Sequence, residues 1–334
     1  MIRQRPVELL APARNVECAM AAVDHGADAV YIGASRFGAR ASAGNSVEDI
    51  ARLVEYAHTF RVKVYVTVNT ILKDEELPET ERLVWALYRV GVDALIVQDM
   101  ALLELDLPPI PLHASTQMDN RTPEKVKFLH GLGFSQVVLA RELSLAEIQA
   151  VHEACDVPLE VFVHGALCVS YSGQCYVSQH CFGRSANRGE CAQFCRLKFD
   201  MVDSDGRMIE QGRHLLSLKD MNRGEDLERL LDAGVTSLKI EGRLKDVAYV
   251  KNVTAWYRSR LDEIFKRRPE YRRASSGQVS LAFTPCLEKS FNRGFTRYFL
   301  DGRTPDIFSF HTPKSLGEEV LSLIHISEPT RLLS

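Results

Sequence analysis

Short apolar segments rich in β-branched residues recur along this chain and alternate with segments of helical periodicity. Eight strands are predicted, at residues 7–11, 29–32, 62–68, 94–97, 111–114, 136–140, 159–163 and 237–240. Helices are predicted between them, for example at residues 47–60, 79–90, 123–132 and 145–154. Repeated strand–helix units predict a parallel α/β sheet, and eight of them predict a closed TIM-like barrel. An open doubly wound sheet is the alternative, although no G-x-G-x-x-G motif opens the first helix.

Polar side chains follow the predicted strands at their C-terminal ends, where a barrel carries its chemistry. These residues are Arg14, Asn15, Asn69, Gln98, Asp99, Ser115, Gln117, Arg141, Glu142, His164, Glu241 and Arg243. Each of them alone is more often a cap or an ion-pair partner than a catalytic group. As a set they predict one site at the barrel mouth. Within it, His164 would transfer a proton, Glu241 would accept one, and Arg243 would hold an anionic carboxylate.

Cysteines cluster directly after the seventh predicted strand. Cys168, Cys175, Cys191 and Cys195 lie in one glycine-rich stretch. Thiolates are soft ligands for zinc, copper(I) and iron–sulfur centres, and four of them complete a coordination set. Disulfides or buried apolar cysteines fit poorly, because the flanking residues are polar and residues 1–6 do not resemble a secretory signal. We therefore predict a metal centre at the barrel mouth.

The spacing of these cysteines bears on the metal. Structural zinc sites usually pair their ligands as C-x2-4-C, and only Cys191 and Cys195 are that close, because six residues separate Cys168 from Cys175. The irregular spacing favours an iron–sulfur cluster, with zinc as the alternative. Cys181 is a further candidate that would replace one ligand if it lies nearby.

Composition and segment boundaries limit the class of protein. A net charge of −3, 46% hydrophobic residues and no apolar run of about 20 residues predict a cytoplasmic protein without a membrane span. Residues 1–265 are predicted to form the barrel, with a cysteine-rich insertion at about 165–200 and a hairpin within 197–218 that covers the metal. Residues 266–320 would begin a truncated C-terminal domain. Residues 321–334 resemble translated adaptor sequence and are excluded from fold reasoning.

Several motifs resemble one protein family. The sequence EVFVHGALC at residues 160–168, with YSGQC at 171–175, resembles the collagenase-like peptidase family U32. The resemblance includes ELLAPA at 8–13, HASTQ at 113–117 and KIEGR at 239–243, and extends to about residue 315. Within the family, GRSANRG at 183–189 and ASSG at 274–277 are most similar to the bacterial members that modify ribosomal RNA.

This resemblance implies an oxygen-independent hydroxylation that forms 5-hydroxycytidine in 23S ribosomal RNA, either naked or in an assembling large subunit. It implies a 4Fe–4S cluster held by Cys168, Cys175, Cys191 and Cys195, and prephenate as a required metabolite. For an RNA substrate, Arg184, Arg188 and Arg196 beside the cysteines are candidate phosphate contacts.

Two other functions stay open. The first is the peptidase that the family name suggests, although the chain lacks H-E-x-x-H and G-x-S-x-G; a nucleophilic cysteine paired with His164 or His180 would be needed. The second is a non-catalytic RNA-binding module that the metal stabilises.

Overall fold

Parallel strands form a closed barrel in this computed structural model, which describes residues 4–34, 44–311 and 331–332. The eight barrel strands are β1 (Arg5–Ala13), β2 (Ala29–Gly33), β3 (Lys63–Val68), β4 (Ala94–Val97), β5 (Leu112–Ala114), β6 (Gln136–Val138), β7 (Leu159–Gly165) and β11 (Ser237–Ile240). Neighbours in this order pair in parallel, and β11 closes the ring by pairing with both β7 and β1. The predicted barrel is confirmed, and the open-sheet alternative is wrong.

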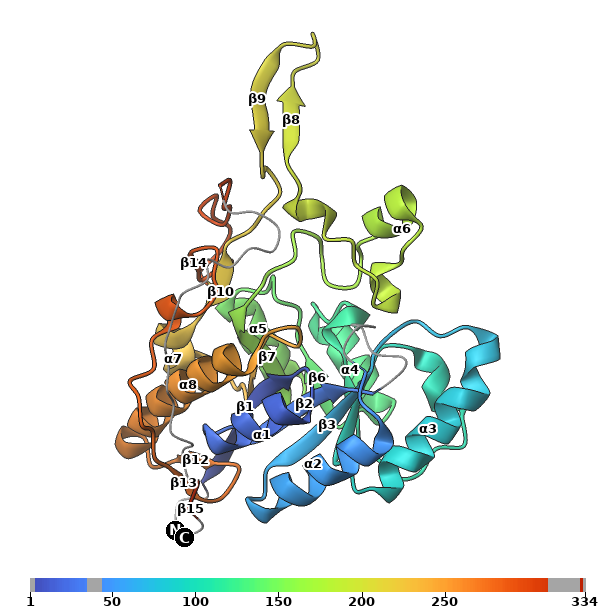
Figure 1. The fold of residues 1–334 in the computed structure, drawn as a ribbon, viewed down its shortest axis with the longest axis vertical. Helices are drawn as coiled ribbons and strands as arrows, with labels where there is room; N and C mark the ends of the chain where they lie inside the picture. Colours follow the sequence, from blue (N-terminus) through green and yellow to red (C-terminus); the bar gives the residue numbers. More distant parts are fainter. Residues whose placement is uncertain (1–3, 35–43, 312–330, 333–334) are drawn as a thin grey trace.

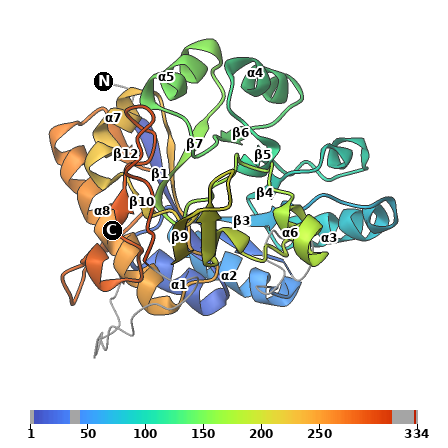
Figure 2. The same cartoon turned by 90° about the horizontal axis from the view of Figure 1, so that it is seen from above.

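Helices surround the barrel on its outer face (Figures 1 and 2). They are α1 (Val16–Asp24), α2 (Val47–Thr59), α3 (Leu77–Arg89), α4 (Pro123–Gly131), α5 (Leu145–Ala154), α7 (Leu227–Asp232) and α8 (Val247–Arg267). Side-chain caps fix where several of them begin: the hydroxyls of Ser46 and Ser144 accept from the third backbone N–H of α2 and α5, each in a reciprocal capping box. Branched strand side chains such as Val66 and Val161 pack against the apolar faces of the helices to form the main core.

The connection from β7 to β11 carries an insertion. It holds α6 (Val177–Phe182), the antiparallel hairpin of β8 (Phe199–Val202) and β9 (Met208–Arg213), and β10 (Asp220–Asn222), which pairs antiparallel with β7. The predicted hairpin is confirmed. Its predicted covering role is wrong, because the ribbon stands away from the barrel (Figure 1) and its residues 200–212 are exposed, except half-buried Asp203 at the turn.

Residues after α8 return to the barrel. Strand β12 (Tyr271–Arg273) pairs with β1, and β14 (Phe295–Thr296) pairs with β10, while β13 (Gln278–Val279) pairs with β15 (Arg331–Leu332). A separate domain at 266–320 stays a prediction, and residues 312–320 lie outside the described ranges. So does the predicted foreign tail at 321–334, apart from β15. None of the described helices is both long and apolar enough to cross a bilayer.

Candidate functional site

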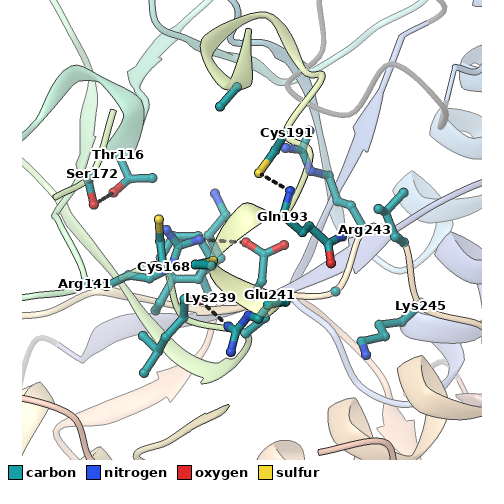
Figure 3. Close-up of a pocket in the computed structure, with 18 of the residues that line it drawn as sticks. Thr116, Arg141, Cys168, Ser172, Cys191, Gln193, Lys239, Glu241, Arg243 and Lys245 are labelled. Atoms are coloured by element: carbon teal, nitrogen blue, oxygen red, sulfur yellow. Dashed lines mark hydrogen bonds and ion pairs between the residues drawn. The ribbon is translucent and has the colours of Figure 1, made fainter. Parts of the chain in front are cut away.

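A cavity of about 1300 Å³ opens at the C-terminal ends of the barrel strands, between the barrel and the cysteine-rich insertion (Figure 3). Most of the predicted strand-end set reaches it. The members of that set that line the cavity are Arg14, Asn69, Ser115, Gln117, Arg141, Glu241 and Arg243. The cavity therefore lies at the mouth of the barrel, where the sequence predicts the site.

Glu241 and Arg141 form an ion pair inside this cavity. The Arg141 Nη2 lies 2.7 Å from Glu241 Oε2, and each side chain is only 14% exposed. The Arg141 guanidinium also lies over the ring of Phe162, 3.7 Å from its centroid. Figure 3 shows the Glu241 carboxylate pointing into the cavity with Arg141 beside it. Partial burial strengthens this pair relative to a surface ion pair, so the carboxylate is held in one orientation.

Arg243 is fixed to the opposite side of the barrel. Its Nη1 donates to Thr67 Oγ1 at 2.8 Å, and its guanidinium lies 5.7 Å from the ring centroid of Tyr31. The Tyr31 hydroxyl donates to the Ile240 carbonyl at 2.8 Å, which holds the ring in place. Arg243 is 8% exposed and still lines the cavity, so it is a preorganised cation for an anionic group.

Lys239 adds a second buried cation beneath the cavity. Its ammonium is paired with Glu160, whose other oxygen accepts from Gln136 Nε2 at 2.6 Å. Burial lowers the pKa of Lys239, and the neighbouring Glu160 carboxylate opposes that change. Lys239 was not among the residues predicted from the sequence. A lysine inside the apolar segment of β11 was the available signal, because an isolated charge in a barrel strand requires a partner.

His164 does not reach the cavity. A β-bulge places Phe162 opposite Lys239 and His164 opposite Ile240, so one extra residue of β7 turns His164 toward α8. There its ring packs against Tyr257 at a centroid distance of 5.5 Å, and it is only 2% exposed. Burial, and next the charge of Lys245, lower its pKa to about 3. The structure therefore separates His164 from Glu241 and Arg243, with which we grouped it.

Positive charge dominates the cavity wall. Among the residues that the structure describes, its acidic side chains are Glu241 and Asp246. The basic ones are Arg14, Arg141, Arg196, Lys239, Arg243, Lys245, Lys289 and Arg293. Burial lowers the pKa of Lys245 to about 8, although Asp220 favours its charged form. Converging cations in a partly enclosed cleft attract phosphate or carboxylate groups.

The four predicted ligand cysteines line this same cavity. None of the chain's cysteines forms a disulfide. Burial, and then the nearby Cys195, raise the pKa of Cys168 to about 11, and burial also raises the pKa of Cys195. Cys181 is exposed on α6 and is absent from the cavity wall among the described residues.

The fit of these thiols to a metal centre is partial. Four cysteines on one cavity are the donor set of an iron–sulfur cluster. However, within the ranges that the structure describes, no three cysteine, histidine or carboxylate side chains are close enough to hold one metal ion. The residues thus match a cluster in donor type and location, and binding it requires the cysteine loop to draw the thiols together.

Two contacts attach the cysteine loop to the barrel. Ser172 donates from its backbone N–H and from its hydroxyl to the Glu142 carboxylate, at 2.9 and 3.0 Å. At Gly173 the backbone crosses the Gln117 carbonyl so closely that an added Cβ would lie 2.1 Å from that oxygen. Glu142, which we predicted as a mouth residue, therefore anchors the loop between Cys168 and Cys175.

The three arginines predicted to bind RNA have different surroundings. Arg196 is 5% exposed and donates to Ser217 Oγ and to the backbone carbonyls of residues 167 and 218. Arg188 makes a bidentate ion pair with Glu76, at 2.7 and 2.9 Å. Arg184 alone of the three is exposed. Intramolecular contacts thus occupy two of these guanidinium groups, and the structure does not gather the three into one patch.

The peptidase family U32 model matches residues 14–308 of this chain. Over 322 residues, covering 96% of the chain, the sequence is 55% identical to a 23S rRNA 5-hydroxycytidine synthase of Escherichia coli. A tRNA hydroxylation protein of Bacillus subtilis is 35% identical over 100% of the chain and 81% of its own length. A collagenase of Porphyromonas gingivalis is 32% identical over 89% of the chain and 74% of its own length.

The chain spans 49% of the length of the Escherichia coli relative. Among solved structures, a U32 peptidase aligns with a TM-score of 0.46 and 15% identity, covering 71% of this chain and 94% of its own.

Proposed function

Because this chain belongs to peptidase family U32 and is 55% identical to an Escherichia coli 23S rRNA 5-hydroxycytidine synthase, we propose that it hydroxylates a cytidine of 23S ribosomal RNA. That identity, over 96% of the chain, is the observation that carries the proposal. The cavity supports it, because eight basic side chains against two acidic ones suit a polyanionic substrate. In this proposal the protein acts in the cytoplasm, together with its ribosomal RNA substrate.

The target base must leave its stack to reach groups at the bottom of the barrel mouth. In this proposal the base enters the cavity beside Glu241, whose carboxylate Arg141 orients at 2.7 Å. Glu241 would accept a proton from the bound base. His164 is given no role in proton transfer, since its imidazole lies outside the cavity wall.

The cofactor is a second part of the proposal. Cys168, Cys175, Cys191 and Cys195 would hold a 4Fe–4S cluster, with zinc as the alternative metal. The cluster would supply one-electron redox chemistry when bound. The support is the convergence of four thiols on one cavity.

A carboxylate metabolite is the third part. Prephenate carries two carboxylates, and Arg243 presents a buried cation at the cavity wall. We propose that Arg243 binds one carboxylate through its planar fork. Isothermal titration of prephenate should show weaker binding to Arg243→Gln than to the wild-type protein. Equal affinity of the two proteins would remove Arg243 from this role.

The deciding experiment is hydroxylation of 23S rRNA fragments by anaerobically purified protein, with 5-hydroxycytidine measured by mass spectrometry. Wild-type protein should contain iron and sulfide and form product, and serine variants of the four cysteines should lose both. Glu241→Gln should keep its iron and lose product, whereas Glu153→Gln, at an exposed site on α5, should keep both. Fully iron-loaded wild-type protein that leaves cytidine unmodified would contradict the function.

The cavity lacks the side-chain arrangement that a cysteine peptidase requires. No histidine is among the described residues of the cavity wall, so the cysteine–histidine pair that a thiol peptidase would use is not formed there. A raised pKa at Cys168 is also the opposite of an activated thiolate. Collagen cleavage by metal-free protein, lost in Cys168→Ser, would favour the peptidase instead. Tight RNA binding without product would favour the non-catalytic module.

A further inference from the structure

A second, shallower pocket of about 330 Å³ adjoins the main cavity. The two pockets share the lining residues Gln117, Gly173, Gln174, Tyr176 and Asn187. Its volume is at the lower end of the usual range for small-ligand sites, about 300–1,000 Å³. A ligand that extends out of the main cavity along this side would enter it.

Gly173 and the Gln117 carbonyl form a ridge of backbone that lines both pockets. Gly173 has a φ of +76° and passes against the Gln117 carbonyl, where no side chain fits. Because the ridge consists of main chain held by Ser172 and Glu142, it is fixed in place. The two pockets are thus adjacent, as two neighbouring units of one polymer would require.

Tyr176 provides an aromatic surface in this second pocket. It directly precedes α6, lines both pockets, and leaves 58% of its surface exposed. A tyrosine ring so exposed beside a cavity presents a face on which a nucleobase can stack. Such stacking is independent of base identity, because every base has a π-face.

The charges of the pocket suit a phosphate next to that base. The Asp99 carboxylate accepts from the backbone N–H groups of Leu72 and Ala101, at 2.7 and 2.9 Å, so both of its oxygens already have a hydrogen-bond donor. Lys125, in the first turn of α4, lines the pocket and makes no ion pair within the part of the chain that the structure describes. Its ammonium lies 6.0 Å from the centroid of the Phe128 ring, a contact that leaves its hydrogen-bond donors available to an anion.

We propose that this second pocket binds the nucleoside adjacent to the target cytidine, with its base stacked on Tyr176 and its phosphate beside Lys125. The inference rests on the proposed RNA hydroxylation and adds a flanking-nucleotide subsite to it. The subsite selects a single-stranded or unpaired segment, since a base in a duplex could not stack on Tyr176.

The test compares two RNA ligands by fluorescence anisotropy: a single-stranded trinucleotide with a central cytidine, and the same RNA with abasic flanking positions. Tyr176→Ala should weaken binding of the first about tenfold and leave binding of the second unchanged. Tyr176→Phe should bind both as the wild type does, because it keeps the ring. Lys125→Ala should weaken both and reduce the salt dependence of binding. Tyr88→Ala, an exposed aromatic on α3, is the matched control.

Equal affinity of Tyr176→Ala and wild-type protein for the intact trinucleotide would overturn the subsite. So would an equal loss for both RNAs, because Tyr176 would then contact the target nucleotide itself. Thermal denaturation checks that each variant is folded. Wild-type protein that shows the predicted binding pattern and forms no 5-hydroxycytidine would contradict the proposed function and leave the subsite intact.

Discussion

Two ion pairs in the barrel differ in their access to water. Arg141 and Glu241 are each 14% exposed, whereas Lys239 and Glu160 are 5% and 0% exposed. The Arg141–Glu241 pair, which is the more accessible of the two, can contact a ligand and exchange partners when one binds. The buried pair has no such freedom, and its removal from water makes each charge depend on the other. Glu241 can therefore interact with a bound substrate, whereas Glu160 holds the Lys239 ammonium in place.

Glu160→Gln should destabilise the protein strongly, by about 3–5 kcal/mol, because it leaves the Lys239 ammonium buried without a counter-charge. Urea unfolding followed by circular dichroism measures the loss. The double variant Glu160→Gln with Lys239→Met should recover much of it, since both charges are then gone. A single variant within about 1 kcal/mol of wild type would show that water reaches Lys239.

Lys245 should make anion binding depend on pH. Its pKa of about 8 means that the ammonium loses its charge as pH rises from 7 to 9. Affinity for an RNA trinucleotide should fall about fivefold over this range, as expected for the loss of about 1 kcal/mol of attraction. Lys245→Arg should bind with little change, because arginine keeps its charge. Identical pH profiles for the two proteins would exclude Lys245 as the cause.

At the scale of elements, strand periodicity predicted the barrel and the edge that carries the site. It did not predict on which side of β7 His164 lies, because the bulge opposite Lys239 and Ile240 has no sequence signature. The intramolecular contacts of Arg188 and Arg196 could not be predicted either. Their partners Glu76 and Ser217 are distant in the sequence or belong to no recognisable motif. Periodicity predicts which face of a strand or helix is apolar. It does not predict which polar side chains will form hydrogen bonds or ion pairs in the fold.

The ridge at Gly173 holds the cysteine loop in position, and Gly173→Ala should displace it. The new Cβ would lie 2.1 Å from the Gln117 carbonyl oxygen, and φ is +76°. Amide hydrogen exchange should rise in residues 168–176, and iron content should fall. Gly183→Ala is the matched control, because Gly183 also has a positive φ, +64°, but nothing lies within 4 Å of its Cβ. Equal effects of both substitutions would show that strain at a positive φ, and not the contact with Gln117, causes the change.

Across the whole molecule, several buried ionisable groups link folding to pH. Burial lowers the pKa of His25 to about 4, and of His113 and His164 to about 3. Below pH 6.5 the unfolded chain therefore binds protons at these sites that the folded protein does not, so stability falls with acid. Glu8 acts in the opposite sense. Burial raises its pKa to about 7, so between pH 4.5 and 7 the folded state binds the extra proton.

Near pH 5.5 the three histidines outweigh the one glutamate, so these groups should lower the free energy of unfolding by about 2.5 kcal/mol for each unit that the pH falls. Urea titrations from pH 5 to pH 8 measure it. Glu8→Gln removes the opposing term, because its amide does not titrate while Tyr65 and Ser237 keep a polar partner. The difference in free energy of unfolding between this variant and the wild type should be more favourable to the variant at pH 8 than at pH 5. The variant's free energy of unfolding should also fall more steeply as the pH is lowered. Parallel curves for the two proteins would mean that Glu8 is already ionised in the fold at pH 5, and that water reaches the barrel interior around it.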